Sequence, residues 1–193
     1  MSAGPDRARI WTIGHSSRSL DEFLALLAAH RIECIADVRR HAGSRKHPQF
    51  NPDALARSLG ERGIDYVAMP DLGGRRSTRG DSPHTVWRNP SFRGYADYMD
   101  SPAFAEALDR LAALAGASRT AMMCSEAVWW RCHRSMISDA LKACGWCVLH
   151  VLDAGPAKEH PYTSAASIVD GRLAYGAGPA PGDAGAPQSV SRR

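Results

Sequence analysis

Two short motifs near the middle of the chain carry the residue types best suited to chemistry. Cys124 directly follows an apolar run, and Glu126 lies two residues beyond it. Further on, His133 and Arg134 are adjacent. A thiol near a histidine and an arginine has a lowered pKa and is nucleophilic, whereas a carboxylate can act as a general acid or base. The pattern predicts that Cys124, Glu126 and His133 are catalytic.

Each of these residues also has a structural interpretation. Cys124 could be a buried thiol at the end of a strand, and Glu126 could form an ion pair with Arg39 or Arg134. We expect the Glu126–Arg134 pair, because an arginine can hold a carboxylate by two parallel hydrogen bonds.

Two further interpretations of the cysteines are disfavoured. Cys124 and Arg131 nearly match the phosphate-binding loop of cysteine phosphatases, but the intervening segment is one residue too long and lacks glycine. Cys124, Cys132, His133 and His15 are residue types that bind zinc, yet their spacing matches none of the common structural zinc patterns. The sequence therefore predicts no metal site, and it identifies no cofactor.

The basic residues are concentrated in three segments, 39–47, 72–93 and 125–134. These segments hold eleven of the 24 Lys and Arg residues but only two acids, although the formal net charge of the chain is only +4. Such segregation favours an anionic partner. Arg134 lies where a helix is expected to begin, and a cation there opposes the helix dipole unless a bound anion compensates for it. The alternative is that this side chain points outward.

Alternating strand and helix signals predict the fold. Short apolar runs at 9–13, 32–38, 64–69, 120–124 and 147–152 are typical of strands. Helix starts are indicated by Ser19 with Glu22, by Asn51-Pro52, by Ser91 and by Ser101-Pro102. This order predicts a three-layer α/β fold, Rossmann-like or flavodoxin-like, with about five mainly parallel strands flanked by helices. We expect one domain over residues 8–153 and a C-terminal tail over 154–193, partly or wholly disordered, because its composition shifts to Ala, Gly, Pro and Ser.

The predicted strand ends bring the candidate residues to one edge of the sheet. Ligands bind beyond the carboxyl ends of strands in open α/β sheets. The ligand-binding candidates at these ends are His15, Ser16, Asp37, Arg39, Gly73, Gly74 and Arg134. Of the ligand-binding and catalytic candidates, we expect seven to line one pocket: His15, Asp37, Arg39, Cys124, Glu126, His133 and Arg134.

Several of these motifs resemble one known family. Thr12-Ile13-Gly14-His15-Ser16, Asp37-Val38-Arg39, Leu72-Gly73-Gly74, Cys124-Ser125-Glu126 and Cys132-His133-Arg134 are similar to the domain-of-unknown-function 488 family, from about residue 10 to 152. The sequence departs from the pattern at His41-Ala42, where a proline is expected soon after the Asp-x-Arg motif. The resemblance implies a fold and a site, but no reaction.

Two function classes remain open. The first is an enzyme that acts on a phosphate-bearing substrate, a nucleotide or a nucleic acid. The second is a non-catalytic nucleic-acid-binding module, in which aromatic residues near the basic segments stack on bases. Those aromatics are Trp87, Phe92, Tyr95, Trp129 and Trp130, and they could instead form a lid. No apolar run is long enough to span a membrane and the start is polar, so a cytoplasmic location is expected. Neither the oligomeric state nor the reaction follows from the sequence.

Overall fold

The computed structural model describes residues 8–176 and contains a six-stranded, mostly parallel sheet. Its strand order is β3-β2-β4-β1-β5-β6, and only β6 is antiparallel to its neighbour. The strands are β1 (Arg9–Gly14), β2 (Cys34–Asp37), β3 (Asp65–Ala68), β4 (Thr120–Cys124), β5 (Cys147–Val151) and β6 (Lys158–Glu159). The predicted α/β class is confirmed, and all five predicted strands are present.

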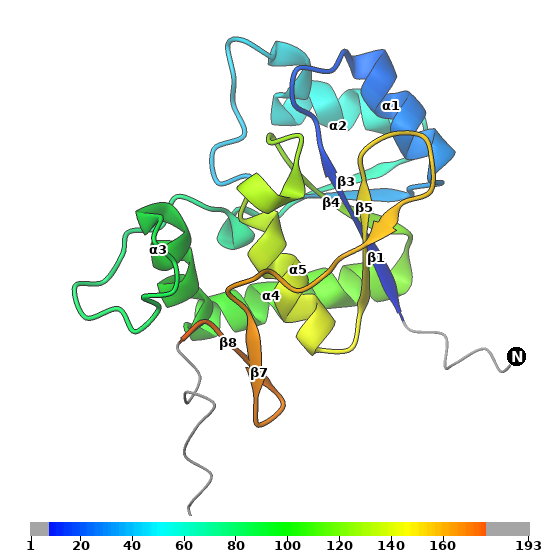
Figure 1. Ribbon diagram of the computed structural model, residues 1–193. Coiled ribbons are helices and arrows are strands. Elements are labelled where there is room, and N and C mark those ends of the chain that lie inside the picture. Colours follow the sequence, from blue (N-terminus) through cyan, green and yellow to red (C-terminus); the bar gives the residue numbers. More distant parts are fainter. Residues whose placement is uncertain (1–7, 177–193) are drawn as a thin grey trace, which may run out of the picture.

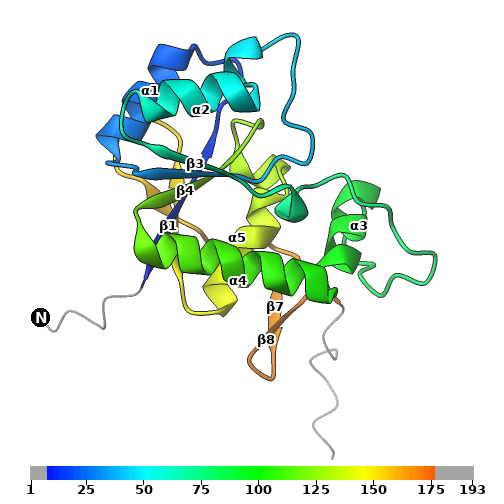
Figure 2. The same cartoon turned by 180° about the vertical axis from the view of Figure 1, so that it is seen from behind.

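Helices cover both faces of the sheet and give the molecule three layers (Figure 1). The view from behind shows α1 and α2 on one side of the strands and α4 and α5 on the other (Figure 2). The helices are α1 (Leu20–Ala29), α2 (Pro52–Gly60), α3 (Pro90–Met99), α4 (Pro102–Ala117) and α5 (Arg134–Ala143), with short 3-10 turns at Pro48–Phe50, Pro70–Leu72 and Trp129–Arg131.

Local capping determines where most of these helices begin. Ser19 and Glu22 form the predicted capping box, and Ser101 accepts a hydrogen bond from the backbone of Phe104. The cap of α3 is Asn89, two residues before the predicted Ser91. Asn51 precedes α2 as predicted, but its side chain instead accepts a bond of 2.6 Å from the Ser44 amide and so fixes the basic loop.

The two faces of the sheet bury separate apolar cores. On one face, Phe23 and Leu27 of α1 pack with Leu55 of α2 against Ile13 and Ile35. On the other face, α3, α4 and α5 pack against strand residues such as Met122 and Val148. This division follows from strand alternation, because successive side chains of each strand point to opposite faces.

The strand order creates a crevice at the carboxyl end of β4. The strand β4 lies between β2 and β1. The chain leaves β1 and β2 toward the face covered by α1 and α2, but it leaves β4 toward the face covered by α5. Loops that diverge in this way open the space in which doubly wound sheets bind ligands.

The ordered domain continues past residue 153, where the sequence prediction ended it. Strand β6 pairs with β5, and β7 (Ser167–Val169) forms a hairpin with β8 (Arg172–Ala174). Residues 154–176 of the predicted tail are therefore structured. Polar residues among them donate hydrogen bonds to a buried carboxylate, and composition alone does not reveal such a contact. The remainder of the predicted tail, residues 177–193, lies outside the described residues.

That buried group is Asp139 of α5, which is fully inaccessible to solvent. Its carboxylate accepts bonds from His160 Nε2 at 3.0 Å, from the Thr163 amide and hydroxyl at 2.9 and 2.6 Å, and from the Tyr175 hydroxyl at 2.8 Å. A buried carboxylate is tolerated only when it is hydrogen-bonded in this way.

Among the described residues, no helix is long and apolar enough to cross a membrane.

We expect Tyr175→Phe to lower the free energy of unfolding by about 1.5–3 kcal/mol, the usual range for a hydrogen bond to a charged group. Tyr175 is 3% exposed. Tyr162→Phe is the matched control, because Tyr162 is 37% exposed and should change stability by less than about 0.5 kcal/mol. Urea unfolding of both variants measures the difference. Equal stabilities would show that the Tyr175 hydroxyl does not anchor the C-terminal segment.

A second prediction concerns His150, which is buried in β5 between Thr12 and His160 and stacks on Trp129. Burial, with the nearby His160 and Arg134, lowers the pKa of His150 from 6.5 to about 2. The unfolded chain therefore binds a proton below about pH 6.5 that the folded chain does not, so stability should fall as pH decreases.

The contribution of His150 to this slope is at most about 1.4 kcal/mol per pH unit. Unfolding measured between pH 7.5 and 4.5 should show a shallower decline for His150→Gln than for the wild type. The exposed His41→Gln should keep the wild-type slope. An unchanged slope in His150→Gln would contradict the assignment.

Candidate functional site

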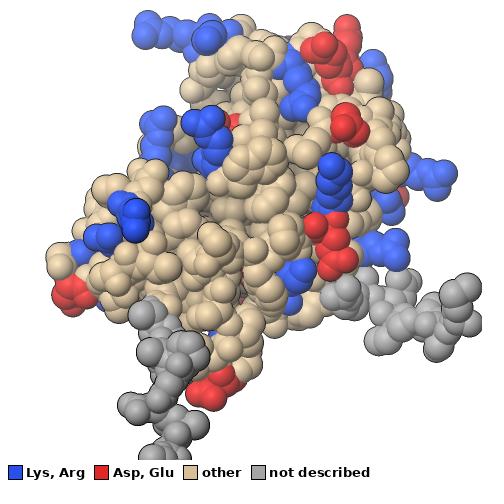
Figure 3. All heavy atoms as spheres, in the orientation of Figure 1, with Lys and Arg blue, Asp and Glu red and all other residues tan. Residues whose placement is uncertain are grey.

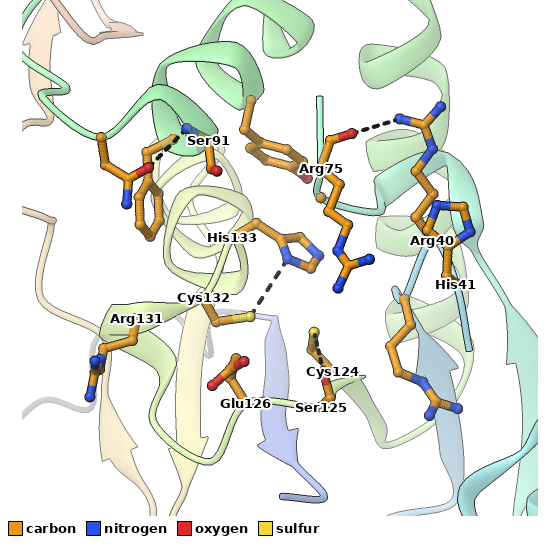
Figure 4. A pocket seen from close by; sticks show the side chains of 15 residues that line it. Arg40, His41, Arg75, Ser91, Cys124, Ser125, Glu126, Arg131, Cys132 and His133 are labelled. Carbon is orange, nitrogen blue, oxygen red and sulfur yellow. Dashed lines mark hydrogen bonds between the residues drawn. The ribbon is translucent and has the colours of Figure 1, made fainter. Parts of the chain in front are cut away.

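A pocket with a volume of about 360 Å³ opens at the crevice beyond β4. Its walls come from the loops after β2, β3 and β4 and from the first turn of α3 (Figure 4). In the space-filling view, blue Lys and Arg side chains border a hollow on the left of this face (Figure 3). The lining residues are Arg39, Arg40, His41, Gly74, Arg75, Asn89, Ser91, Phe92, Tyr95, Cys124, Ser125, Glu126, Arg131, Cys132 and His133.

Two sulfurs and an imidazole meet inside this pocket. The Sγ atoms of Cys124 and Cys132 and one ring nitrogen of His133 all lie within 4.8 Å of one another. Cys124 and Cys132 are 6% and 4% exposed, and His133 is half-buried. Figure 4 shows the three side chains converging from the end of β4 and the start of α5. The structure thus brings together residues that are eight positions apart in the chain.

The imidazole of His133 is held in one orientation. Its Nε2 lies 3.1 Å from the Val38 carbonyl, which can only accept, so Nε2 carries the proton and donates it. In the neutral ring Nδ1 is then free of hydrogen, and it lies 3.6 Å from Cys132 Sγ. Gly74 packs on the ring, since a Cβ at that position would lie 2.9 Å from Nδ1. The unprotonated nitrogen therefore faces the sulfurs.

Arg134 does not face the pocket. Its side chain is 1% exposed; Nη2 donates to the backbone carbonyl of Glu126, and Nε lies 3.5 Å from Cys132 Sγ. Within the described part of the chain, no carboxylate forms an ion pair with this guanidinium. A buried cation is tolerated when it is hydrogen-bonded, and Arg134 contacts both a carbonyl and the Cys132 sulfur, a group that can become negatively charged.

The pKa values of the two thiols are shifted in opposite directions, because one hydrogen bond joins them. The hydrogen bond with Cys124 and the positive charge of Arg134 lower the pKa of Cys132. The hydrogen bond with Cys132, together with burial, raises the pKa of Cys124. Cys132, rather than the predicted Cys124, is therefore the thiol that ionises first.

Arg39 lines the pocket, but most of its hydrogen-bonding capacity is used within the protein. Nε and Nη2 donate to the two oxygens of Asp37 at 2.8 and 2.6 Å, Nη2 also donates to the Phe50 carbonyl, and Nη1 donates to His15 at 3.2 Å. Tyr66 donates a further bond of 2.7 Å to Asp37. This buried pair fixes the loop after β2, and it leaves Arg39 with little capacity to hold a ligand.

His15 does not line the pocket, but it is hydrogen-bonded to Arg39, which does. Its Nδ1 donates to the Ser16 carbonyl, its Nε2 accepts from Arg39, and its ring stacks on Phe50 at 4.3 Å. Burial lowers the pKa of His15 to about 4, and the charge of Arg39 adds to this effect, so the ring is neutral. Ser16 has a left-handed backbone conformation, and its amide donates to Ser125.

The structure divides the predicted site residues into two sets. Cys124, Glu126, His133 and Arg39 line one pocket, as expected, and the ligand-binding candidate Gly74 lines it too. The other predicted residues do not line it: His15, Ser16, Asp37, Gly73 and Arg134. They hold the loops around it, and Gly73 permits close approach of Arg40, since a Cβ there would lie 2.5 Å from the Arg40 Cβ. The expected Glu126–Arg134 ion pair is absent, because Arg134 binds the backbone of Glu126 and the Glu126 side chain is exposed.

Several pocket residues were missing from the predicted set. Cys132 was not included, although it belongs to the Cys-His-Arg motif and lies just before a helix start, which is a signal for an acidic thiol. The lining cations Arg40, Arg75 and Arg131 belong to the basic segments noted in the sequence. Single basic residues in loops carry no further signal that separates pocket side chains from solvated ones.

Comparison with known proteins agrees with the motifs. A family model described as "Domain of unknown function DUF488" matches residues 19–141. The chain belongs to the DUF488 family. All of the pocket-lining residues fall within the matched segment, whereas His15, His150 and His160 lie outside it. The chain matched no curated protein and no solved structure.

We expect Arg134→Ala to lower the free energy of unfolding by more than about 2 kcal/mol, because it leaves the Glu126 carbonyl unpaired and opens a cavity beside Cys132. Glu126→Gln should change it by less than about 0.5 kcal/mol, because that side chain is exposed. Thermal and urea unfolding of the two variants give the comparison. Similar losses in both would show that the Glu126 carboxylate, and not its backbone, holds the loop.

Proposed function

We propose that this protein is an enzyme that binds a phosphate-bearing substrate, such as a nucleotide or the end of a nucleic acid strand, in the pocket beyond β4. The chemistry would take place beside the sulfurs of Cys124 and Cys132. The single observation that carries the proposal is the combination, among the described residues that line one pocket, of four arginines with two thiols and two histidines.

The charges that line the pocket favour an anion. Arg39, Arg40, Arg75 and Arg131 line it, whereas Glu126 is the one carboxylate that lines it within residues 8–176. The side chains of Arg40, Arg75 and Arg131 are exposed, and Arg40 uses one donor for a bond of 3.0 Å to the Arg75 carbonyl, which leaves its other donors available to a ligand. Arginine binds phosphate oxygens by paired hydrogen bonds, which fixes the orientation of the group as well as its position.

The N-terminus of α3 adds a second source of positive potential. Asn89, Ser91 and Phe92, from the cap and first turn of this ten-residue helix, line the pocket. Backbone N–H groups and the helix dipole at such a terminus favour a negatively charged group. The pocket volume of about 360 Å³ lies at the small end of the range for ligand sites, and this suits a mononucleotide-sized group.

The aromatic residues favour a pocket enzyme over a surface that stacks bases. Trp87 stacks on Phe92 at 5.0 Å, Tyr95 is buried, and Trp129 stacks on His150. Of the five aromatics near the basic segments, Trp130 alone is largely exposed, at 53%. A module that binds single strands by stacking uses several exposed rings, one for each base.

The pocket residues suggest roles in the proposed reaction. The exposed arginines would hold the phosphate group, and Glu126 would act as a general acid or base at the pocket mouth. Cys132 and Cys124, with His133, would form the reactive centre. The buried Arg134 and the Asp37–Arg39 pair would position that centre without contacting the substrate.

Binding of inorganic phosphate, pyrophosphate, adenosine monophosphate and a short single-stranded oligonucleotide tests the anion site. Arg40→Ala, Arg75→Ala and Arg131→Ala should each weaken binding about twofold to fivefold, as expected for a partly exposed charge contact, and the triple variant by more than about tenfold. Arg62→Ala is the control, because Arg62 is exposed just after α2, near the opposite edge of the sheet. Calorimetry at low and high salt measures these changes.

Turnover separates an enzyme from a binding module. The ³¹P NMR spectrum of a nucleotide mixture should change with time in the presence of wild-type protein. Cys132→Ser should bind with unchanged affinity but leave the spectrum constant. Binding of the oligonucleotide alone, with a steep salt dependence and no spectral change, would instead establish the non-catalytic module. Binding that is insensitive to all three arginines would exclude the pocket.

A further inference from the structure

We infer that Cys124, Cys132 and His133 bind a zinc-class divalent metal ion, with a fourth coordination position open to the pocket. The inference is independent of the proposed substrate, because it depends on the ligand atoms alone. Their spacing along the chain disfavoured a metal site, but their arrangement in space favours one.

The distances between the donor atoms fit tetrahedral zinc. Zinc–sulfur bonds are about 2.3 Å and zinc–nitrogen bonds about 2.0–2.1 Å, so a tetrahedral angle separates the sulfur and nitrogen by about 3.6 Å. The distance from Cys132 Sγ to His133 Nδ1 is 3.6 Å. The Cys124 sulfur lies within 4.8 Å of both atoms, about 1 Å at most beyond the sulfur–sulfur separation of about 3.8 Å that tetrahedral zinc requires.

The histidine is already in the form that a metal requires. A ligating imidazole donates its other ring N–H to a carbonyl or carboxylate, which fixes the ring and leaves the ligating nitrogen unprotonated. His133 does so through Nε2 to the Val38 carbonyl at 3.1 Å. Gly74 on the ring and Tyr95, whose ring centre lies 5.2 Å away, further restrict its orientation.

The charges are compatible with a divalent cation despite the surrounding arginines. Binding would displace the S–H protons of Cys124 and Cys132, and the two thiolates would balance both charges of the ion. The Nε of Arg134 would still donate to the Cys132 sulfur. The ion and its two thiolates would be neutral together, Arg134 would keep its contacts with the Cys132 sulfur and the Glu126 carbonyl, and the arginines would continue to attract an anion to the pocket.

The site has the character of an open rather than a closed metal centre. Structural zinc sites have four protein ligands, whereas catalytic sites have three and leave one position for water or substrate. Two cysteines and one histidine, all lining a solvent-connected pocket, match the second type. Thiolate and imidazole ligands select zinc over magnesium or calcium, which prefer oxygen.

Cobalt substitution tests the inference on the full-length protein. The protein is reduced, treated with a chelator, freed of chelator and titrated with Co²⁺. We expect one equivalent to bind, with visible bands typical of tetrahedral cobalt and a near-ultraviolet band from sulfur-to-cobalt charge transfer. Zn²⁺ added afterwards should abolish these bands. Weak, octahedral-type spectra in the reduced wild type would overturn the proposal without any variant having to fold.

Variants identify the ligands. Cys124→Ser, Cys132→Ser and His133→Ala should each weaken Zn²⁺ binding by more than about a hundredfold. Loss of a residue that only hydrogen-bonds to a metal ligand weakens binding by up to about a hundredfold, and loss of the ligand itself should weaken it more. Cys144→Ser is the matched control, because that thiol is exposed at the end of α5, and it should bind as the wild type does. Cobalt–sulfur bands that persist when Cys124 and Cys132 are both replaced by serine would exclude this site.

The test of metal binding can be distinguished from the test of the proposed function. Phosphate binding measured on the metal-free protein depends on the exposed arginines, whereas the cobalt bands depend on the sulfurs. Loss of one with retention of the other identifies which of the two proposals fails.

Discussion

The site depends on the burial of one guanidinium, that of Arg134. From the first residue of α5 it reaches back to the carbonyl of Glu126, and it thereby joins the loop after β4 to the helix that follows. The same side chain lies against the Cys132 sulfur. Gly14 of β1 lies on the other side of the Glu126 carbonyl, where a Cβ would lie 1.8 Å from that oxygen. The loop between the two cysteines is thus clamped from both sides, and this fixes the position of the sulfurs.

A second polar pair sets the opposite wall of the pocket. Asp37 and Arg39 are both buried, and their bonds with Tyr66, Phe50 and His15 connect the ends of β1, β2 and β3. Removal of either partner would leave an uncompensated charge in the core. Arg39 and Arg134, which were predicted to bind a ligand, therefore use most of their hydrogen-bond donors within the protein, whereas the exposed Arg40, Arg75 and Arg131 have donors available to a ligand. Arg39 and Arg134 thus stabilise the site, whereas Arg40, Arg75 and Arg131 are the cations exposed at the pocket.

Local signals predicted the fold well. Strand alternation and the caps at Ser19 and Ser101 depend on neighbouring residues only, so they can be interpreted from the sequence. The gathering of Cys124, Glu126 and His133 followed from the general position of strand ends in α/β sheets. The orientation of Arg134 did not follow, because a cation at a helix start can turn outward, toward a ligand or into the core. The choice depends on whether a buried carbonyl is within reach, which only the assembled structure shows.

The structure of residues 154–176 could not be predicted from composition for a related reason. His160, Thr163 and Tyr175 all donate to Asp139, a residue more than twenty positions earlier in the chain, and no local pattern reports such a contact. This arrangement has a consequence for biosynthesis. Until His160, Thr163 and Tyr175 have left the ribosome, the side chain of Asp139 has none of these donors, and burying it is unfavourable. The final packing of α5 therefore waits for residue 175, so that a prematurely terminated chain retains an exposed helix face that proteases and chaperones can recognise.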